Sequence, residues 1–144
     1  DRLMFGSIVA KDYMSIKPVT FRADTHIFEA IQVLLQNKIS GATVVNDANE
    51  AVGVISEMDC LQAIINVGYY DQGGGYVGDF MTRNVESIDQ NINIIDAAQL
   101  LLKTKRRRMP VIEDGKFKGQ ISARSILMAF KNFRNQDQGA EDNR

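Results

Sequence analysis

The sequence has very little of the chemistry on which most enzymes and metal sites depend. It contains one cysteine, Cys60, and one histidine, His26. A single cysteine excludes an intrachain disulfide, and these two residues are too small a donor set for an ordinary zinc site. They also leave only one or two ways to assemble a nucleophile with a histidine base. We therefore predict a protein that is not an enzyme, needs no metal and works in a reducing, cytoplasmic environment.

Long hydrophobic runs and an excess of basic charge are also missing. No apolar stretch approaches the roughly 18 to 20 residues that span a bilayer, and the first residues show no signal-peptide pattern. The formal net charge is −1, from 17 basic and 18 acidic residues, whereas proteins dedicated to nucleic acid are usually more basic. These absences argue against a membrane partner and against nucleic-acid binding. The 44% of hydrophobic residues is enough for a globular core.

What the sequence does contain is an internal repeat. Asp12–Ser15 recurs as Asp79–Thr82, and the same offset carries an apolar stripe that begins at Ile27 onto one that begins at Ile94. Both stripes have the spacing of an amphipathic helix. Short β-branched segments follow each stripe, then another strand and a second helix. Each copy therefore predicts strand, helix, strand, strand, helix, an α/β (α+β) fold in a unit too small to be stable alone.

The repeat also suggests domain boundaries. We place the first copy at residues 8–67 and the second at residues 77–133. Residues 68–78 are rich in glycine and tyrosine and predict a linker. Residues 134–144 lack apolar periodicity and are expected to be disordered.

The repeated landmarks are the two Asp-aromatic-Met-Ser/Thr openings, the alanine-centred first helices, Arg108–Ile112, and the strand ends Gly53–Asp59 and Gly119–Ser125. Their order resembles that of CBS domains, named after cystathionine β-synthase. The chain is similar to a stand-alone bacterial-type CBS pair, or Bateman module. That resemblance implies two β-α-β-β-α repeats about a pseudo-twofold axis, with clefts that bind adenosine-containing ligands such as AMP, ADP, ATP or S-adenosylmethionine.

The segment from Gly53 to Asp59 is the main candidate for ligand binding. The hydroxyl of Ser56, beside free N–H groups at a helix start, suits a phosphate oxygen. Asp59 lies one helical turn further on, and its carboxylate can accept hydrogen bonds from both hydroxyls of a ribose. The alternative is that Ser56 only caps the helix and Asp59 only faces the helix dipole. With the family resemblance added, we predict the nucleotide role.

The second repeat departs from this pattern. Ser122 keeps the position of Ser56, but Ser125 stands where the first repeat has Asp59. A serine hydroxyl cannot hold both ribose hydroxyls as a carboxylate does. We therefore expect two unequal sites, of which the one with Asp59 is the stronger.

The resemblance implies further residues at both sites. Basic residues just before a hydrophobic-Pro pair meet ligand phosphates in the family, which points to Arg107 and Arg108; the alternative is that they are solvated cations at a helix end. The segment after each Met-Ser/Thr opening is expected to close over the ligand of the other repeat, and apolar side chains to line the adenine. The stronger site would then include Ile55, Asn84, Val85, Glu86, Met109 and Pro110, and the weaker site Lys17, Pro18 and Val19. For Ile55, Met109 and Pro110 the alternative is that their side chains only pack in the core.

These expectations combine into a non-enzymatic regulatory module that signals by conformational change when an adenine nucleotide or another adenosyl ligand binds. No resident cofactor is expected, although Mg²⁺ can accompany a polyphosphate. We expect a homodimer through the helices that begin near Met58 and Arg124, and a downstream protein that the sequence does not name. Two alternatives stay open: a ligand-free dimerisation scaffold, and a nucleic-acid-binding protein that uses the basic run 103–108.

Overall fold

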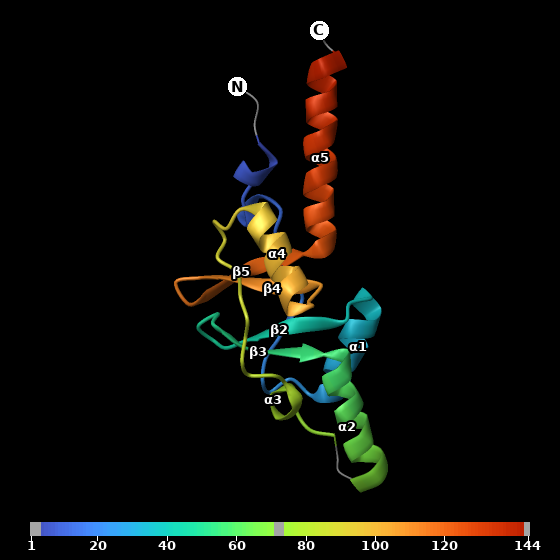
Figure 1. The fold of residues 1–144 in the computed structure, drawn as a ribbon. Helices are drawn as coiled ribbons and strands as arrows, with labels where there is room; N and C mark the ends of the chain where they lie inside the picture. Colours follow the sequence, from blue (N-terminus) through green and yellow to red (C-terminus); the bar gives the residue numbers. More distant parts are fainter. Residues whose placement is uncertain (1–3, 71–73, 143–144) are drawn as a thin grey trace. The chain divides into compact units, whose positions relative to one another are not determined.

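The computed structural model describes residues 4–70 and 74–142, which form two units (Figure 1). Unit 1 contains residues from 1–17, 86–113 and 118–144, and unit 2 contains residues from 18–85 and 114–117. The elements along the chain are the 3-10 turns η1 (Phe5–Ser7) and η2 (Ala10–Asp12), β1 (Thr20–Phe21), α1 (Ile27–Asn37), β2 (Gly41–Val45), β3 (Ala51–Ser56), α2 (Glu57–Tyr70), α3 (Val77–Phe80), α4 (Ile94–Thr104), β4 (Arg108–Glu113), β5 (Lys116–Ser122) and α5 (Ala123–Asp142).

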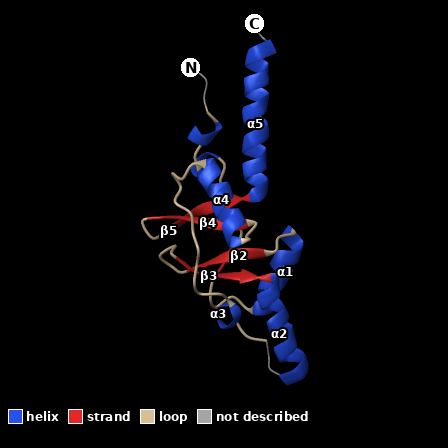
Figure 2. Cartoon of the chain, viewed as in Figure 1, coloured by secondary structure: helices blue, strands red, loops and turns tan. Residues whose placement is uncertain are grey.

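Unit 2 is built on a three-stranded sheet in the order β1-β2-β3, of which Figure 2 shows β2 and β3 side by side. β1 runs parallel to β2, and β3 runs antiparallel to it with a register shift between Val44 and Val45. Helices α1 and α2 contact each other beside this sheet. The core joins apolar side chains from the strands and both helices, among them Phe21, Ile27, Leu34, Val44 and Ile55. The first repeat therefore has the predicted β-α-β-β-α order.

Unit 1 repeats this plan with a smaller sheet. β4 and β5 pair with each other, and Ile88 stands where the first repeat has β1. The main chain of Ile88 makes a single parallel bridge to Val111, with its N–H donating to the carbonyl of Pro110 over 2.9 Å. The first strand predicted for the second repeat is thus reduced to one bridge, although the mixed α/β fold is confirmed.

The opening segment of each repeat, Asp12–Ser15 or Asp79–Thr82, pairs with the sheet of the other repeat. In unit 2, Thr82 exchanges two main-chain hydrogen bonds of 2.9 Å with Val54 of β3. In unit 1, Ser15 exchanges hydrogen bonds of 2.8 and 2.9 Å with Gln120 of β5. Met81 accordingly lies in the core of unit 2. The units of the folded chain are therefore not the repeats of the sequence, because each sheet gains an edge from the other copy.

The first helices of the two repeats begin and end alike. The side chain of His26 accepts from the N–H of Phe28 at the start of α1, and that of Asn93 accepts from the N–H of Asp96 at the start of α4. Both helices end at a lysine in the left-handed region, Lys38 with φ 54° and Lys105 with φ 55°. The duplication therefore extends to the helix ends.

Two helices continue past the boundaries expected for the repeats. α2 reaches Tyr70 and α5 reaches Asp142, so residues 134–142, which we expected to be disordered, are helical instead. Arginine, glutamine, alanine and glutamate in this segment extend an existing helix at little cost even without an apolar stripe, although Gly139 within it is unfavourable. Residues 71–73 of the linker and residues 143–144 of the tail lie outside the described residues.

Candidate functional site

Ser56 and Asp59 form a reciprocal cap at the junction of β3 and α2. Asp59 Oδ2 accepts from the Ser56 N–H at 2.8 Å and from the Ser56 hydroxyl at 3.0 Å. The Asp59 N–H in turn donates to Ser56 Oγ over 3.2 Å. Both side chains are half-buried. This is a capping box, in which two otherwise unpaired N–H groups of the helix start gain partners.

The cap leaves part of the Asp59 carboxylate available. The hydrogen bonds of the described residues engage Oδ2 and none of them engages Oδ1. A carboxylate oxygen at the start of a helix can accept hydroxyl donors from a ligand while its partner oxygen stays in the cap. The capping role and the ligand role are therefore compatible, and the box fixes the carboxylate in position.

The second repeat has the same cap without the charge. The Ser122 N–H donates to Ser125 Oγ, and the Ser125 N–H donates to Ser122 Oγ, each over 3.0 Å. The hydroxyl of Ser125 donates back to the Ser122 carbonyl over 2.8 Å. That hydroxyl is already engaged and carries no charge. This junction is therefore a weaker hydrogen-bond acceptor for a ligand than the carboxylate of Asp59.

Arg107 and Arg108 lie beside the second junction. The N–H of Ala123, the first residue of α5, donates to the Arg107 carbonyl over 2.8 Å. The first repeat has the same contact between Glu57 N–H and the Ser40 carbonyl, at 2.9 Å. The Arg107 side chain is exposed, whereas Arg108 is half-buried and its Nε has no partner among the described residues. Arg108 therefore retains a buried donor that an acceptor oxygen would satisfy.

Glu86 forms an ion pair that the sequence did not indicate. Its carboxylate lies 3.5 Å from the guanidinium of Arg106, and both side chains remain partly exposed. At this exposure the pair contributes little to stability. The Glu86 carboxylate partly offsets the positive charge of Arg106.

The remaining predicted site residues are distributed over both units. Ile55 and Met109 are buried in the two cores, and Pro110 is buried as well, so their side chains serve packing. Their burial fits the core alternative better than an exposed adenine wall. For the stronger site, Asn84 and Val85 share unit 2 with Ser56 and Asp59, while Glu86, Arg107, Arg108, Met109 and Pro110 belong to unit 1. For the weaker site, Lys17, Ser122 and Ser125 belong to unit 1, and Pro18 and Val19 to unit 2.

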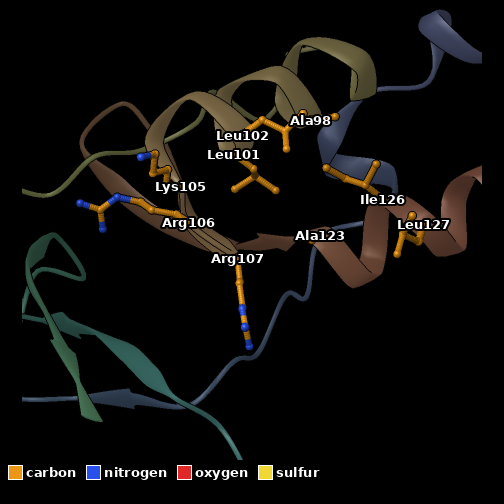
Figure 3. A pocket seen from close by; sticks show the side chains of 9 residues that line it. All are labelled: Ala98, Leu101, Leu102, Lys105, Arg106, Arg107, Ala123, Ile126 and Leu127. Atoms are coloured by element: carbon orange, nitrogen blue, oxygen red, sulfur yellow. The ribbon is translucent and has the colours of Figure 1, made fainter. Parts of the chain in front are cut away.

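A pocket in unit 1 was not predicted from the sequence. It has a volume of about 440 Å³ and opens between α4 and the start of α5 (Figure 3). Three basic residues lie at one end of it, Lys105, Arg106 and Arg107. A signal was present in the run of three leucines that ends at Leu102, which makes the apolar stripe of α4 wider than one buried face needs. The apolar lining consists of Ala98, Leu101, Leu102, Ala123, Ile126 and Leu127.

Cys60 is buried on α2, with 5% of its surface exposed. Burial raises the pKa of its thiol, and the carboxylates of Asp59 and Glu57 raise that pKa further. The thiolate is the reactive form, so both effects slow its chemistry. We expect iodoacetamide at neutral pH to alkylate the native protein at least about tenfold more slowly than the urea-unfolded protein. Equal rates in the two states would show that α2 opens locally.

No group of three or more His, Cys, Asp or Glu side chains among the described residues comes together as a metal site. None of the helices in the described part of the chain is both long and apolar enough to cross a membrane.

The chain belongs to the CBS-domain family, whose model matches residues 10–66 and 77–132. Among curated relatives, it is 26% identical to the uncharacterized protein MJ1225 of Methanocaldococcus jannaschii, over 81% of this chain and 41% of that protein. It is 31% identical to inosine-5'-monophosphate dehydrogenase of Aquifex aeolicus, over 79% of this chain and 23% of the enzyme. CBSX1 of Arabidopsis thaliana is 29% identical, over 83% of this chain and 59% of that protein. The chain thus spans well under two thirds of these relatives.

Solved structures show the same fold. The crystal structure of CBSX2 in complex with AMP has a TM-score of 0.79 at 30% identity, covering 88% of this chain and 98% of that one. The CBS pair of protein MJ0100, in complex with 5'-methylthioadenosine and S-adenosyl-L-methionine, has a TM-score of 0.71 at 24% identity, covering 86% and 96%. The expected CBS-pair architecture is therefore confirmed.

Proposed function

We propose that this chain is a non-enzymatic regulatory module that binds an adenine nucleotide or a related adenosyl ligand and signals by changing conformation. The observation that carries the proposal is the Ser56–Asp59 cap, which holds a carboxylate with one oxygen available at a helix start. The AMP complex of CBSX2, a relative at 30% identity over nearly the whole chain, supports an adenosine-containing ligand. Ligand binding shifts the module only by its differential affinity for two conformations.

Within the proposed site, different residues bind different parts of the ligand. Asp59 accepts the ribose hydroxyls, and Ser56 with the N–H groups at the start of α2 takes an oxygen of the ligand. Arg107 and Arg108 supply cations for phosphate, since guanidinium groups match phosphate oxygens in a forked geometry. Asn84, Val85 and Glu86 close over the ligand, while Ile55, Met109 and Pro110 act by holding β3 and β4 in place. Ser122, Ser125, Lys17, Pro18 and Val19 form the weaker site.

We also propose self-association through the helix faces near Met58 and Arg124. α2 buries Cys60 and Ala63, and α5 buries Ile126 and Ala129, while both helices leave other large apolar side chains, such as Met58 and Leu127, exposed. Exposed apolar faces of this kind mark interaction sites in soluble proteins. Residence in the cytoplasm and a downstream protein partner belong to this proposal as well.

The scaffold alternative is favoured by the same exposed apolar faces, because self-association needs no ligand. The nucleic-acid alternative is weaker, since Arg106 in the basic run is paired with Glu86 and the chain is slightly acidic. It predicts binding that weakens steeply with salt.

A ligand panel tests the proposal. We expect AMP, ADP, ATP, NADH or S-adenosylmethionine to raise the melting temperature, because a ligand at 100 times its Kd adds about 2.7 kcal/mol to the free energy of unfolding. Calorimetry would supply the stoichiometry, with ATP titrated in the presence of Mg²⁺ and of EDTA. The absence of any shift, together with a stable dimer by light scattering, would support the scaffold instead.

A further inference from the structure

The pocket between α4 and the start of α5, here the α4–α5 pocket, is hollow because the second repeat lacks two isoleucines. In unit 2, Ile31 and Ile39 occupy the corresponding positions and pack against the core. The second repeat has Ala98 and Arg106 there instead. Alanine is too short to fill the space of an isoleucine, and the Arg106 guanidinium lies 3.5 Å from the carboxylate of Glu86. The hollow of about 440 Å³ is therefore a feature of the second repeat rather than of the fold.

The body of the α4–α5 pocket is aliphatic and open to water. Leu102 and Leu127 belong to its lining and are 79% and 69% exposed. Removing such surface from water is favourable, so a molecule with an apolar body gains free energy by entering. Among the described residues that line the pocket, none is aromatic and none carries a hydroxyl or amide side chain. The lining therefore fits a flexible alkyl chain better than a nucleobase, which needs placed polar groups for its orientation.

The charge of the pocket is positive and is confined to one end. Lys105 and Arg106 lie at the end opposite to Leu127 (Figure 3). The Glu86 carboxylate partly offsets the charge of Arg106, whereas Lys105 is exposed and forms no ion pair with another described residue. A cation at the edge of an apolar pocket attracts an anion to that edge. Lys105 is therefore the group to which an anionic head can bind.

We propose that the α4–α5 pocket binds a free medium-chain aliphatic carboxylate, with its alkyl chain among the leucines and its carboxylate at Lys105. A hydrogen bond between an ammonium group and a carboxylate is charge-assisted, so it fixes the direction in which the chain enters. The volume of about 440 Å³ lies within the range of pockets that enclose small ligands. This site goes beyond the proposed function, because its ligand is not an adenosyl compound.

Chain length and head-group charge provide the first test. Calorimetric titration of the full chain with hexanoate, octanoate and decanoate, each kept below its micelle-forming concentration, measures the three Kd values. We expect Kd to fall about three- to tenfold for each two added methylene groups, since each buried methylene contributes to affinity. Octanol and octylammonium have the same alkyl chain without the negative charge, and both should bind more weakly than octanoate. A Kd that is independent of chain length, or octanol that binds as tightly as octanoate, overturns the proposal.

Amide chemical shifts locate the bound chain. In an NMR titration with octanoate, the amides of residues 98–107 and 123–127 should shift, whereas those of residues 53–61 at the β3–α2 junction should not. Shifts spread over every exposed apolar helix face would mean adsorption to any apolar surface. That result would contradict a defined pocket.

Ala98→Ile restores the isoleucine of the first repeat and should close the pocket. We expect it to weaken octanoate binding at least about tenfold, because the new side chain and the alkyl chain need the same space. The matched control is Gln99→Ile, which adds the same side chain at an exposed position of α4 outside the lining and should leave the Kd unchanged. Circular dichroism establishes that both variants are folded. Octanoate binding of wild-type strength in Ala98→Ile overturns the proposal.

Lys105→Gln tests the contact with the carboxylate without filling the pocket. It should raise the Kd of octanoate about three- to tenfold, because a charge-assisted hydrogen bond is lost. The Kd of octanol should not change, since the alcohol has no charge to pair with Lys105. An equal effect on octanoate and octanol would show that the substitution acts through the fold, and it would contradict the assigned contact.

The AMP titration keeps this proposal separate from the proposed function. Neither Ala98 nor Lys105 belongs to the proposed adenosyl site, so the melting shift with AMP should persist in both variants. If AMP gives no shift in any variant while octanoate binds as described, the proposed function fails and the α4–α5 site stands. If the Kd of octanoate rises with protein concentration, a second copy of the chain occupies the pocket, and the carboxylate site is overturned.

Discussion

Replacing Asp59 by asparagine is expected to weaken AMP binding by roughly 10- to 100-fold. A hydrogen bond to a charged group contributes about 1.5–3 kcal/mol, and about 1.4 kcal/mol corresponds to a factor of ten. Asparagine keeps one oxygen that can still accept from the Ser56 N–H, so the cap at the start of α2 is largely retained. Calorimetric titration of both proteins measures the difference directly.

Ser125→Ala is the matched control, because Ser125 has the corresponding position in the second repeat. Its hydroxyl already donates to the Ser122 carbonyl, so we expect its removal to change AMP affinity less than about threefold. The melting temperature without ligand separates a lost cap from a lost ligand contact. Equal losses of affinity in the two variants would contradict the unequal sites, and no loss in either would remove Asp59 from the site.

Local features of the fold and of the site could be predicted because they depend on residues a few positions apart. The stripe from Ile27 and its copy from Ile94 predict the two first helices, since helical periodicity needs only neighbouring residues. The interval of three residues between Ser56 and Asp59 likewise implies a contact across one turn, which the capping box shows. The same interval in the second repeat predicts the neutral Ser122–Ser125 junction.

Pairings between distant segments could not be predicted from the repeat by itself, and only the family resemblance implied an exchange between the copies. The repeat shows that Ser15 and Thr82 are equivalent, but equivalent copies can pair within a repeat or be exchanged between repeats without any change in the sequence offset. The sequence does not predict the Glu86–Arg106 ion pair either, because any of the five cations between residues 103 and 108 could have been the partner of Glu86. The pocket could not be predicted because Leu102 fits the helical spacing of the stripe that begins at Ile94, whereas α4 buries Leu101 and leaves Leu102 exposed.

Because the opening segment of the first repeat packs against β5, we predict that Gly119 does not tolerate a side chain. A Cβ at this position of β5 would overlap the main-chain carbonyl oxygen of Ser15 and lie 3.2 Å from the sulfur of Met14. The main chain of Ser15 cannot withdraw without losing its two hydrogen bonds to Gln120. We therefore expect Gly119→Ala to lower the free energy of unfolding by about 1–3 kcal/mol, measured by urea denaturation.

Gly53 and Gly115 provide matched comparisons. A Cβ at Gly53, the counterpart in the first repeat, would meet mainly the Met81 side chain, whose sulfur lies 2.6 Å away and can move. Gly53→Ala should therefore cost less than Gly119→Ala. Gly115 has φ 76° and open space around it, so Gly115→Asn should change stability by less than about 0.5 kcal/mol, since asparagine tolerates the left-handed region.

Hydrogen exchange locates the damage. If the opening segment of the first repeat closes the edge of β5, the amides of Ser15 and Gln120 should lose protection in Gly119→Ala, while those of Thr82 and Val54 keep it. Uniform loss across all four amides would mean that the two edges open together. An unchanged stability and unchanged protection would show that Ser15 does not pair with β5, and the exchange of segments between the repeats would then be wrong.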